Sequence, residues 1–135
     1  MVRRALILCV ALLVTGCGTG TAVTGSIRSR LHRPTCPSEI AAASWAREPG
    51  IGRRLTITPT KCGRVTAFAR TDRGFAEAIA KGGKGAPNHD SIYRQFKCHA
   101  LFATAKPEWH LEVRRPLVSW LAMVATRCNP SVSSG

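Results

Sequence analysis

Apolar and polar residues alternate over one short stretch in the first half of the chain. Leu55 and Ile57 would lie on one face of a strand over residues 53–59, with threonines on the other face. This period of two is typical of a strand with one buried face. The Pro-Gly-Ile-Gly sequence at 49–52 favours a turn. We therefore expect an antiparallel hairpin in which this strand pairs with the segment around Trp45.

Further along the chain, the apolar positions follow the period of an amphipathic helix instead. We expect a first helix that Thr71 or Asp72 caps and that stops at two consecutive glycines. A second helix, capped by Asp90 or Ser91, runs toward Phe102. The change of period after the hairpin predicts that the helices follow the strands rather than alternate with them.

A third helix is predicted near the C-terminal end of the sequence, starting at Pro116 and ending at Cys128. Its apolar side chains recur three and four residues apart, so they share one face of the helix. They predict a core-facing stripe made of Leu117, Trp120, Leu121 and Val124. Residues 108–113, before this helix, are expected to be extended or irregular.

Composition places the chain among basic, single-domain proteins. Its 135 residues are 44% apolar, which suffices for one packed core and excludes multi-domain enzymes, repeat arrays and polytopic membrane proteins. Lysine and arginine together number 20 against 7 acidic residues, a formal net charge of +13. Such an excess of positive charge favours anionic partners.

The first residues are typical of an export signal. Two arginines precede an apolar run over residues 5–14, which is about half the length of a membrane-spanning helix. The residues before Cys17 resemble a bacterial lipobox, which implies that residues 1–16 are a signal peptide and that Cys17 is lipidated. An ordinary secretory signal, with Cys17 incidental, is the alternative. The lipoprotein interpretation predicts a protein on the outer face of the cytoplasmic membrane. The ordinary secretory signal predicts an extracellular protein.

Residues 17–35 are rich in Gly, Thr, Ser and Arg and predict a flexible, basic tether. Arg28, Arg30 and Arg33 could contact anionic lipid head groups or wall polymers, and each would contribute about 1 kcal/mol near such a surface. A solvated arm without a partner is the alternative.

Four cysteines lie beyond the predicted signal and lipidation site. An even count in a small exported domain predicts two disulfides. Three pairings are possible, and the spacing suggests Cys36–Cys62 and Cys98–Cys128, each worth about 3 kcal/mol in the chain-entropy model. A metal site is the alternative, but the sequence lacks its usual Cys and His spacing, and we expect neither metal nor other cofactor.

The predicted fold class is therefore α+β: a small, disulfide-stapled single domain over residues 36–130, with an N-terminal β-hairpin followed by about three helices. Residues 131–135 are expected to form a disordered tail.

Several C-terminal motifs are shared with a known family. They are Gln-Phe-Lys-Cys-His at 95–99, Lys-Pro-Glu-Trp-His-Leu-Glu at 106–112, Arg-Pro at 115–116 and Cys-Asn-Pro at 128–130. Over about residues 40–130 the chain resembles a family of exported actinobacterial proteins termed domain of unknown function 2599. The resemblance implies export, disulfides and one compact domain, and it implies no reaction. His110 stands where the family usually has Asn, and Arg114 where it often has Trp.

Candidate catalytic side chains are few. His99 follows a cysteine directly and could serve as a general base, or it could be a packed histidine. His110 and Glu112 would share a face of an extended segment, and with Arg115 they could support ester or phosphodiester hydrolysis. The alternative is a surface strand in which Glu112 forms an ion pair with Arg114 or Arg115.

Candidate binding residues outside the tether are Trp109 and Arg114. Trp109 lies in a polar stretch and could be an exposed stacking platform or a core anchor. The sequence thus favours a lipid-anchored cell-envelope protein that acts as a basic binding or structural module for an anionic envelope polymer or lipid. Nucleic acid is not expected as a physiological partner, since no nucleic-acid fold signature accompanies the charge. The alternative is a small secreted hydrolase that uses His99, His110 and Glu112. The oligomeric state is left open.

Overall fold

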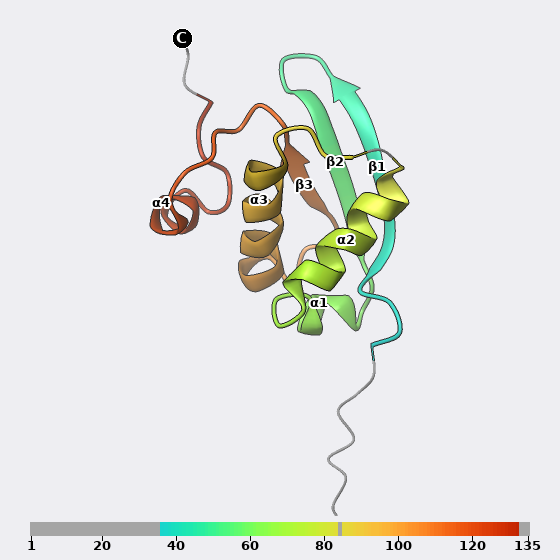
Figure 1. Ribbon diagram of the computed structural model, residues 1–135. Coiled ribbons are helices and arrows are strands. Elements are labelled where there is room, and N and C mark those ends of the chain that lie inside the picture. The colour runs from blue at the N-terminus through green and yellow to red at the C-terminus, as the bar shows by residue number, and fades with distance from the viewer. Residues whose placement is uncertain (1–35, 84, 133–135) are drawn as a thin grey trace, which may run out of the picture. The chain divides into compact units, whose positions relative to one another are not determined.

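The hairpin that the alternation predicts is present, and a third strand extends its sheet (Figure 1). The computed structural model describes residues 36–83 and 85–132. Its strands pair in the order β1-β2-β3, and all neighbours are antiparallel. The elements along the chain are β1 (Ile40–Glu48), β2 (Gly52–Pro59), α1 (Gly63–Thr66), α2 (Thr71–Gly82), α3 (His89–Phe102), β3 (Trp109–Glu112) and α4 (Trp120–Ala125). The α+β prediction is therefore confirmed, with one strand and one short helix more than expected.

The register of the sheet places its apolar residues on one face. Trp45 pairs with Leu55, and Leu55 pairs on its other side with Leu111. The turn between β1 and β2 contains Gly50 and Gly52, whose φ angles of 74° and 85° favour glycine. The strand pairing therefore puts one continuous apolar row on the inner face of the sheet.

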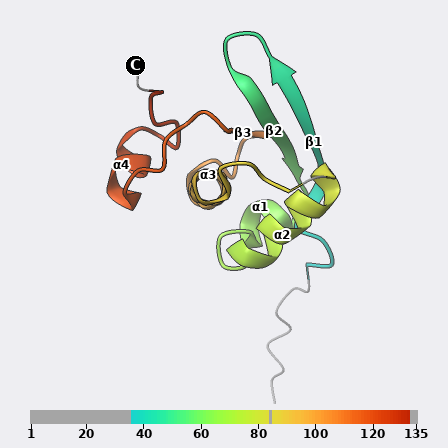
Figure 2. The same cartoon turned by 45° about the horizontal axis from the view of Figure 1, so that its top comes forward.

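The helices cover this inner face and leave the opposite face without a helical layer (Figure 2). The ring of Phe96 in α3 meets that of Trp109 in β3, with centroids 5.6 Å apart. Trp109 is fully buried, and its indole N–H donates to the carbonyl of Ala103 at 3.0 Å. Trp109 is thus a core anchor, and its interpretation as an exposed stacking platform is wrong.

The prediction for the third helix is wrong in extent and orientation. α4 begins only at Trp120, where the Ser119 side chain accepts the N–H of Ala122. The predicted core stripe is largely exposed: Leu117 by 50%, Trp120 by 37% and Leu121 by 79%. The buried residue of α4 is Met123, which packs with the second disulfide. A helix this short takes its orientation from the disulfide and the contacts that hold it, rather than from the spacing of its own apolar residues.

Both disulfides follow the suggested sequential pairing. Cys36–Cys62 ties the start of β1 to α1, and Cys98–Cys128 ties α3 to the turn after α4. The Cα atoms of the two pairs lie 5.7 and 5.5 Å apart. Each covalent bond therefore fixes a short element that buries little apolar surface of its own.

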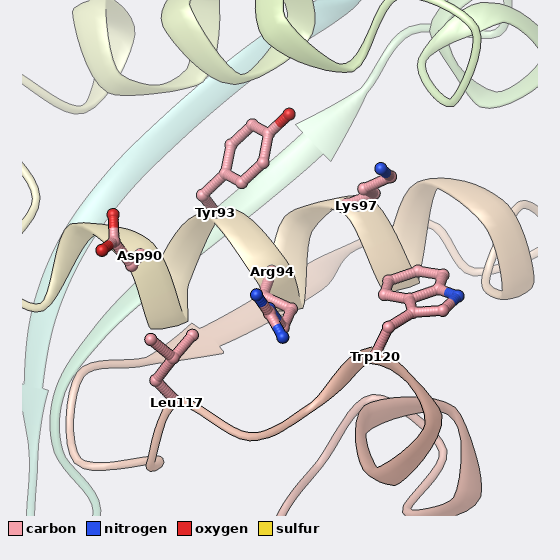
Figure 3. A pocket seen from close by; sticks show the side chains of 6 residues that line it. All are labelled: Asp90, Tyr93, Arg94, Lys97, Leu117 and Trp120. Carbon is pink, nitrogen blue, oxygen red and sulfur yellow. The ribbon is translucent and has the colours of Figure 1, made fainter.

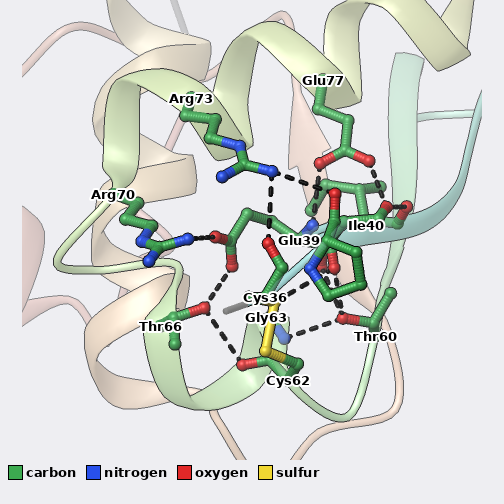
Figure 4. The surroundings of a disulfide bond; sticks show 12 residues. Cys36, Glu39, Ile40, Thr60, Cys62, Gly63, Thr66, Arg70, Arg73 and Glu77 are labelled. Atoms are coloured by element: carbon green, nitrogen blue, oxygen red, sulfur yellow. Dashed lines mark hydrogen bonds and ion pairs between the residues drawn. A yellow bond between two sulfur atoms is a disulfide. The ribbon is translucent and has the colours of Figure 1, made fainter. Parts of the chain in front are cut away.

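The buried Glu39 carboxylate organises the surroundings of the first disulfide (Figure 4). It accepts the hydroxyl of Thr66 and forms an ion pair with Arg70 at 3.4 Å. Its backbone carbonyl lies so close to Gly63 that a Cβ atom there would come within 1.8 Å of the oxygen. This junction between β1 and α1 was not foreseen from the sequence.

The predicted signal peptide (1–16), most of the predicted tether (17–35) and the residues named on them, Cys17, Arg28, Arg30 and Arg33, lie outside the described residues. The last three residues of the predicted tail do so as well. Within the described ranges, no helix has both the length and the apolar character that crossing a membrane requires.

Candidate functional site

Two of the candidate catalytic residues share the outer face of the sheet, as their alternation predicts. In β3, Trp109 and Leu111 are buried while His110 and Glu112 are only partly covered. The Nδ1 atom of His110 lies 3.3 Å from the hydroxyl of Thr56. Glu112 forms the predicted ion pair with Arg115, at 2.8 Å. The Nε2 atom of His110 lies 4.0 Å from a carboxylate oxygen of Glu108, and both side chains are substantially exposed. These contacts describe a polar strand surface.

His99 is held elsewhere, on α3 beneath the sheet. It is 4% exposed, and neither ring nitrogen meets a partner at full hydrogen-bond geometry in the described part of the chain, although hydrogen bonding with the His110 backbone raises the pKa of the ring. Burial, aided by the positive charge of Lys106, lowers the pKa of His99 to about 4. The backbone and the charge of His110 and the charge of Arg115 are near enough to affect the pKa of His99. Among the described side chains, however, no side-chain hydrogen bond or ion pair joins His99 to His110, Glu112 or Arg115.

The acidic side chains are all engaged by other groups. Four of them form ion pairs with Lys or Arg, two lie beside the rings of His89 and His110, and the seventh, Asp72, accepts the hydroxyl of Tyr93 at 2.6 Å. These pairs use few of the cations: Arg54, Arg70, Lys81 and Arg115. Most lysines and arginines between residues 36 and 132 therefore carry charge that no carboxylate of the described chain balances.

Two of these cations lie in a groove between α3 and the segment that leads into α4 (Figure 3). The groove has a volume of about 310 Å³. Its lining residues are Asp90, Tyr93, Arg94, Lys97, Leu117 and Trp120. Tyr93, Arg94 and Lys97 follow one another along α3, while Leu117 and Trp120 belong to the facing segment.

The cations of the groove are positioned by neighbours on the facing segment. The Nζ atom of Lys97 lies 5.6 Å from the centre of the Trp120 ring, within cation–π range. Arg94 donates to the carbonyl of Val118 at 2.5 Å. Both cations are half-buried, and Leu117 and Trp120 add exposed apolar surface. The groove thus joins positive charge to an aromatic face.

A second pairing of a cation with an aromatic ring lies at the hairpin. The guanidinium of Arg53 lies 4.9 Å from the centre of the Trp45 ring. Nearby, Arg114 is exposed and donates to the Gly50 carbonyl at 3.2 Å. Arg114, a predicted binding residue, therefore anchors the segment after β3 to the hairpin turn.

The groove was missed from the sequence because its partners are far apart in the chain. Lys97 lies inside one of the shared motifs, but nothing in its neighbours identifies Trp120 as its contact. Helical periodicity assigned Trp120 to the core, where its ring would not be available to a ligand. As for metal ions, the described residues contain no group of three or more His, Cys, Asp or Glu that could hold one.

Comparisons with known proteins agree with the motifs. A model of the family described as "Protein of unknown function (DUF2599)" matches residues 40–131. The uncharacterized proteins Rv0477 of Mycobacterium tuberculosis and Mb0487 of Mycobacterium bovis are each 31% identical to the chain over 107 residues. These matches span 72% of the chain and 69% of each relative. No solved structure matches the chain. The chain is therefore a member of the DUF2599 family of proteins of unknown function.

Proposed function

We propose that this protein is an exported, lipid-anchored envelope protein that binds an anionic envelope polymer through the groove between α3 and residues 117–120. The observation that carries the proposal is the Lys97 ammonium held over the exposed Trp120 ring, with Arg94 beside it. The lining of this groove holds two cations, Arg94 and Lys97, and one carboxylate, Asp90. The same charge would add attraction to acidic lipids at the surface where the protein is anchored.

The two disulfides support a location outside the cytoplasm. Two disulfides are typical of an oxidising compartment. Lipidation at Cys17 rests on the lipobox-like residues before it. We expect the wild-type protein in the membrane fraction and Cys17→Ala in the medium. A Cys17→Ala protein that stays with the membrane to the same extent would contradict the lipid anchor.

The groove suits a polymer of phosphodiesters that exposes apolar or sugar surface between its charges. Lys97 and Arg94 provide positive charge, and Trp120 provides a flat apolar face next to them. Because each half-buried cation is only partly hydrated, its attraction to an anion is screened less than on a flat surface. Binding of this kind weakens as salt concentration rises.

The test uses the full chain and a soluble polyglycerol-phosphate polymer, with affinity measured by calorimetry at two salt concentrations. We expect Lys97→Gln to weaken binding about fivefold, equivalent to about 1 kcal/mol. The matched control is Lys61→Gln, which removes the same charge from an exposed residue beside α1. The control is expected to change the affinity less than twofold.

If Lys97→Gln and Lys61→Gln lost the same affinity for the polymer, binding at the groove would be contradicted, because the polymer would then respond to net charge alone. Trp120→Leu adds a second criterion, since it removes the aromatic face and keeps every charge. If Trp120→Leu binds like the wild type, the cation–aromatic contact has no part in binding.

A further inference from the structure

A second pocket lies between the end of α3 and the turn that carries the second disulfide. It has a volume of about 400 Å³, within the range of small-molecule sites. Its lining residues are His99, Phe102, Ala103, Lys106, Val124, Arg127 and Cys128. The Cys98–Cys128 disulfide holds its two walls together, so the pocket does not depend on a ligand to form.

The depth of the pocket contains a buried polar side chain. His99 is 4% exposed, and neither ring nitrogen meets a described partner at full hydrogen-bond geometry, although the backbone of His110 lies close enough to raise the pKa of the ring by hydrogen bonding. Buried polar groups are paired in the great majority of cases, and each unpaired one costs about 1–3 kcal/mol. With a pKa of about 4, caused first by burial, the imidazole is neutral at pH 7. A neutral imidazole has one N–H, which the His110 backbone and a ligand in the pocket would compete to accept.

The mouth of the pocket is positively charged. Lys106 and Arg127 are exposed there, and neither takes part in any ion pair that the described residues form. Lys106 is close enough to His99 for its charge to lower the pKa of the imidazole. No Asp or Glu lines this pocket. An anion is therefore the charge type that the site complements.

The rest of the lining is apolar. Phe102 is 57% exposed, which is unusual for so large an apolar side chain, and Val124 faces the same space from α4. Surface of this kind favours a ligand with an apolar body.

The turn that forms one wall has an uncommon backbone conformation. Arg127 and Cys128 both have positive φ angles, 51° and 67°. Such angles are costly for residues other than glycine and are frequent at ligand-binding sites. The N–H of Cys128 donates to the carbonyl of Met123 at 2.9 Å, which holds the turn in place. This conformation brings Arg127 to the mouth of the pocket.

We propose that the pocket binds a monocarboxylate with an apolar body, the carboxylate lying between Lys106 and the His99 N–H and the apolar body lying against Phe102 and Val124. This site is distinct from the groove at Lys97. When the carboxylate binds, the His99 imidazole gains a hydrogen bond, and Lys106 and Arg127 gain a counter-charge. The exposed ring of Phe102 is covered in the same event.

Decanoate below its micelle concentration is a suitable probe, and the full chain is titrated while the ring signals of His99 are followed by NMR. We expect saturable 1:1 binding that shifts the His99 signals and raises the pKa of His99, because a carboxylate stabilises the imidazolium form. Acetate and decanol, which supply the charge or the apolar body alone, are expected to bind at least about tenfold more weakly. Decyl phosphate tests whether the head group is a carboxylate.

Two matched variants locate the site. Lys106→Gln is expected to weaken decanoate binding at least about fivefold, while Lys97→Gln, the variant of the other groove, is expected to leave it unchanged. The proposal would be overturned if the His99 signals did not move, or if Lys106→Gln and Lys97→Gln lost the same affinity for decanoate. It would also be overturned if decanol bound as tightly as decanoate, or if decyl phosphate bound more tightly. His99→Gln keeps a polar side chain but removes the imidazole, so we expect it to weaken decanoate binding. A His99→Gln protein that binds decanoate as tightly as the wild type would also contradict the proposal.

Discussion

The side-chain amide of Gln95 hydrogen-bonds both backbone groups of Glu112. The Glu112 N–H donates to Gln95 Oε1 at 2.9 Å, and Gln95 Nε2 donates to the Glu112 carbonyl at 3.0 Å. Glu112 belongs to β3, an edge strand whose other side pairs with β2. The fully buried amide thus takes the place of a further strand, and it joins α3 to the sheet edge.

Gln95→Leu is expected to lower the free energy of unfolding by about 2 kcal/mol, because the Glu112 N–H loses its partner and the Glu112 carbonyl keeps only the Arg115 N–H. Urea unfolding with intact disulfides measures the change. Lys61→Gln, at an exposed residue, serves as the control and should alter stability by less than about 0.5 kcal/mol. A Gln95→Leu protein as stable as the control would show that this contact is not needed.

Gly63→Ala is expected to destabilise the protein by more than about 3 kcal/mol or to prevent folding. An added Cβ would lie 1.8 Å from the backbone oxygen of Glu39, and neither the disulfide at Cys62 nor β1 can move away easily. Gly85→Ala is the matched control, since nothing lies within 4 Å of its Cβ position. Similar thermal midpoints for the two variants would contradict the close approach of α1 to β1.

Replacing both Cys98 and Cys128 by alanine should cost about 3 kcal/mol, since their disulfide closes a loop with a sequence separation of 30. The effect should be local as well. We expect the amides of α4 to exchange hydrogen much faster by local opening. The amides of β2 should still exchange mainly through global unfolding of the protein. Unchanged protection in α4 would mean that Met123 packing alone holds this helix.

The pH dependence of stability should contain a contribution from His99. Its pKa is about 4 in the folded protein against 6.5 as the ordinary value. Between these values the unfolded chain binds a proton that the folded protein does not. The free energy of unfolding should therefore fall as pH decreases from 6.5 to about 4, by about 3 kcal/mol in total, with no contribution above this window. Parallel profiles for the wild type and His99→Gln would contradict this assignment.

Local sequence patterns were sufficient to predict the hairpin. Alternation places Leu55 and Ile57 on the inner face, and the turn glycines fix where the chain reverses. The sequential disulfides could also be suggested, because each joins segments that follow one another. The pairing of β3 with β2 could not be foreseen, since it brings together residues more than fifty positions apart.

The proposed binding groove depends on contacts that a periodic pattern does not contain. The apolar period of residues 117–124 is real, yet Ser119 starts the helix late and the disulfide orients it so that Met123, not Trp120, is buried. Similarly, the His-Leu-Glu sequence correctly predicted that His110 and Glu112 share a face. It could not show that His99 lies beneath the sheet, because that depends on the packing of α3.

The proposed groove is tested most directly by the indole N–H signals of the three tryptophans during titration of the full chain with polyglycerol phosphate. We expect a saturable shift of the Trp120 signal, with the buried Trp109 signal unchanged. Trp45, under Arg53 at the hairpin, is the internal comparison, because it also has a cation over its ring. A shift of Trp45 with Trp120 unmoved would contradict the account and would place the polymer on the hairpin instead.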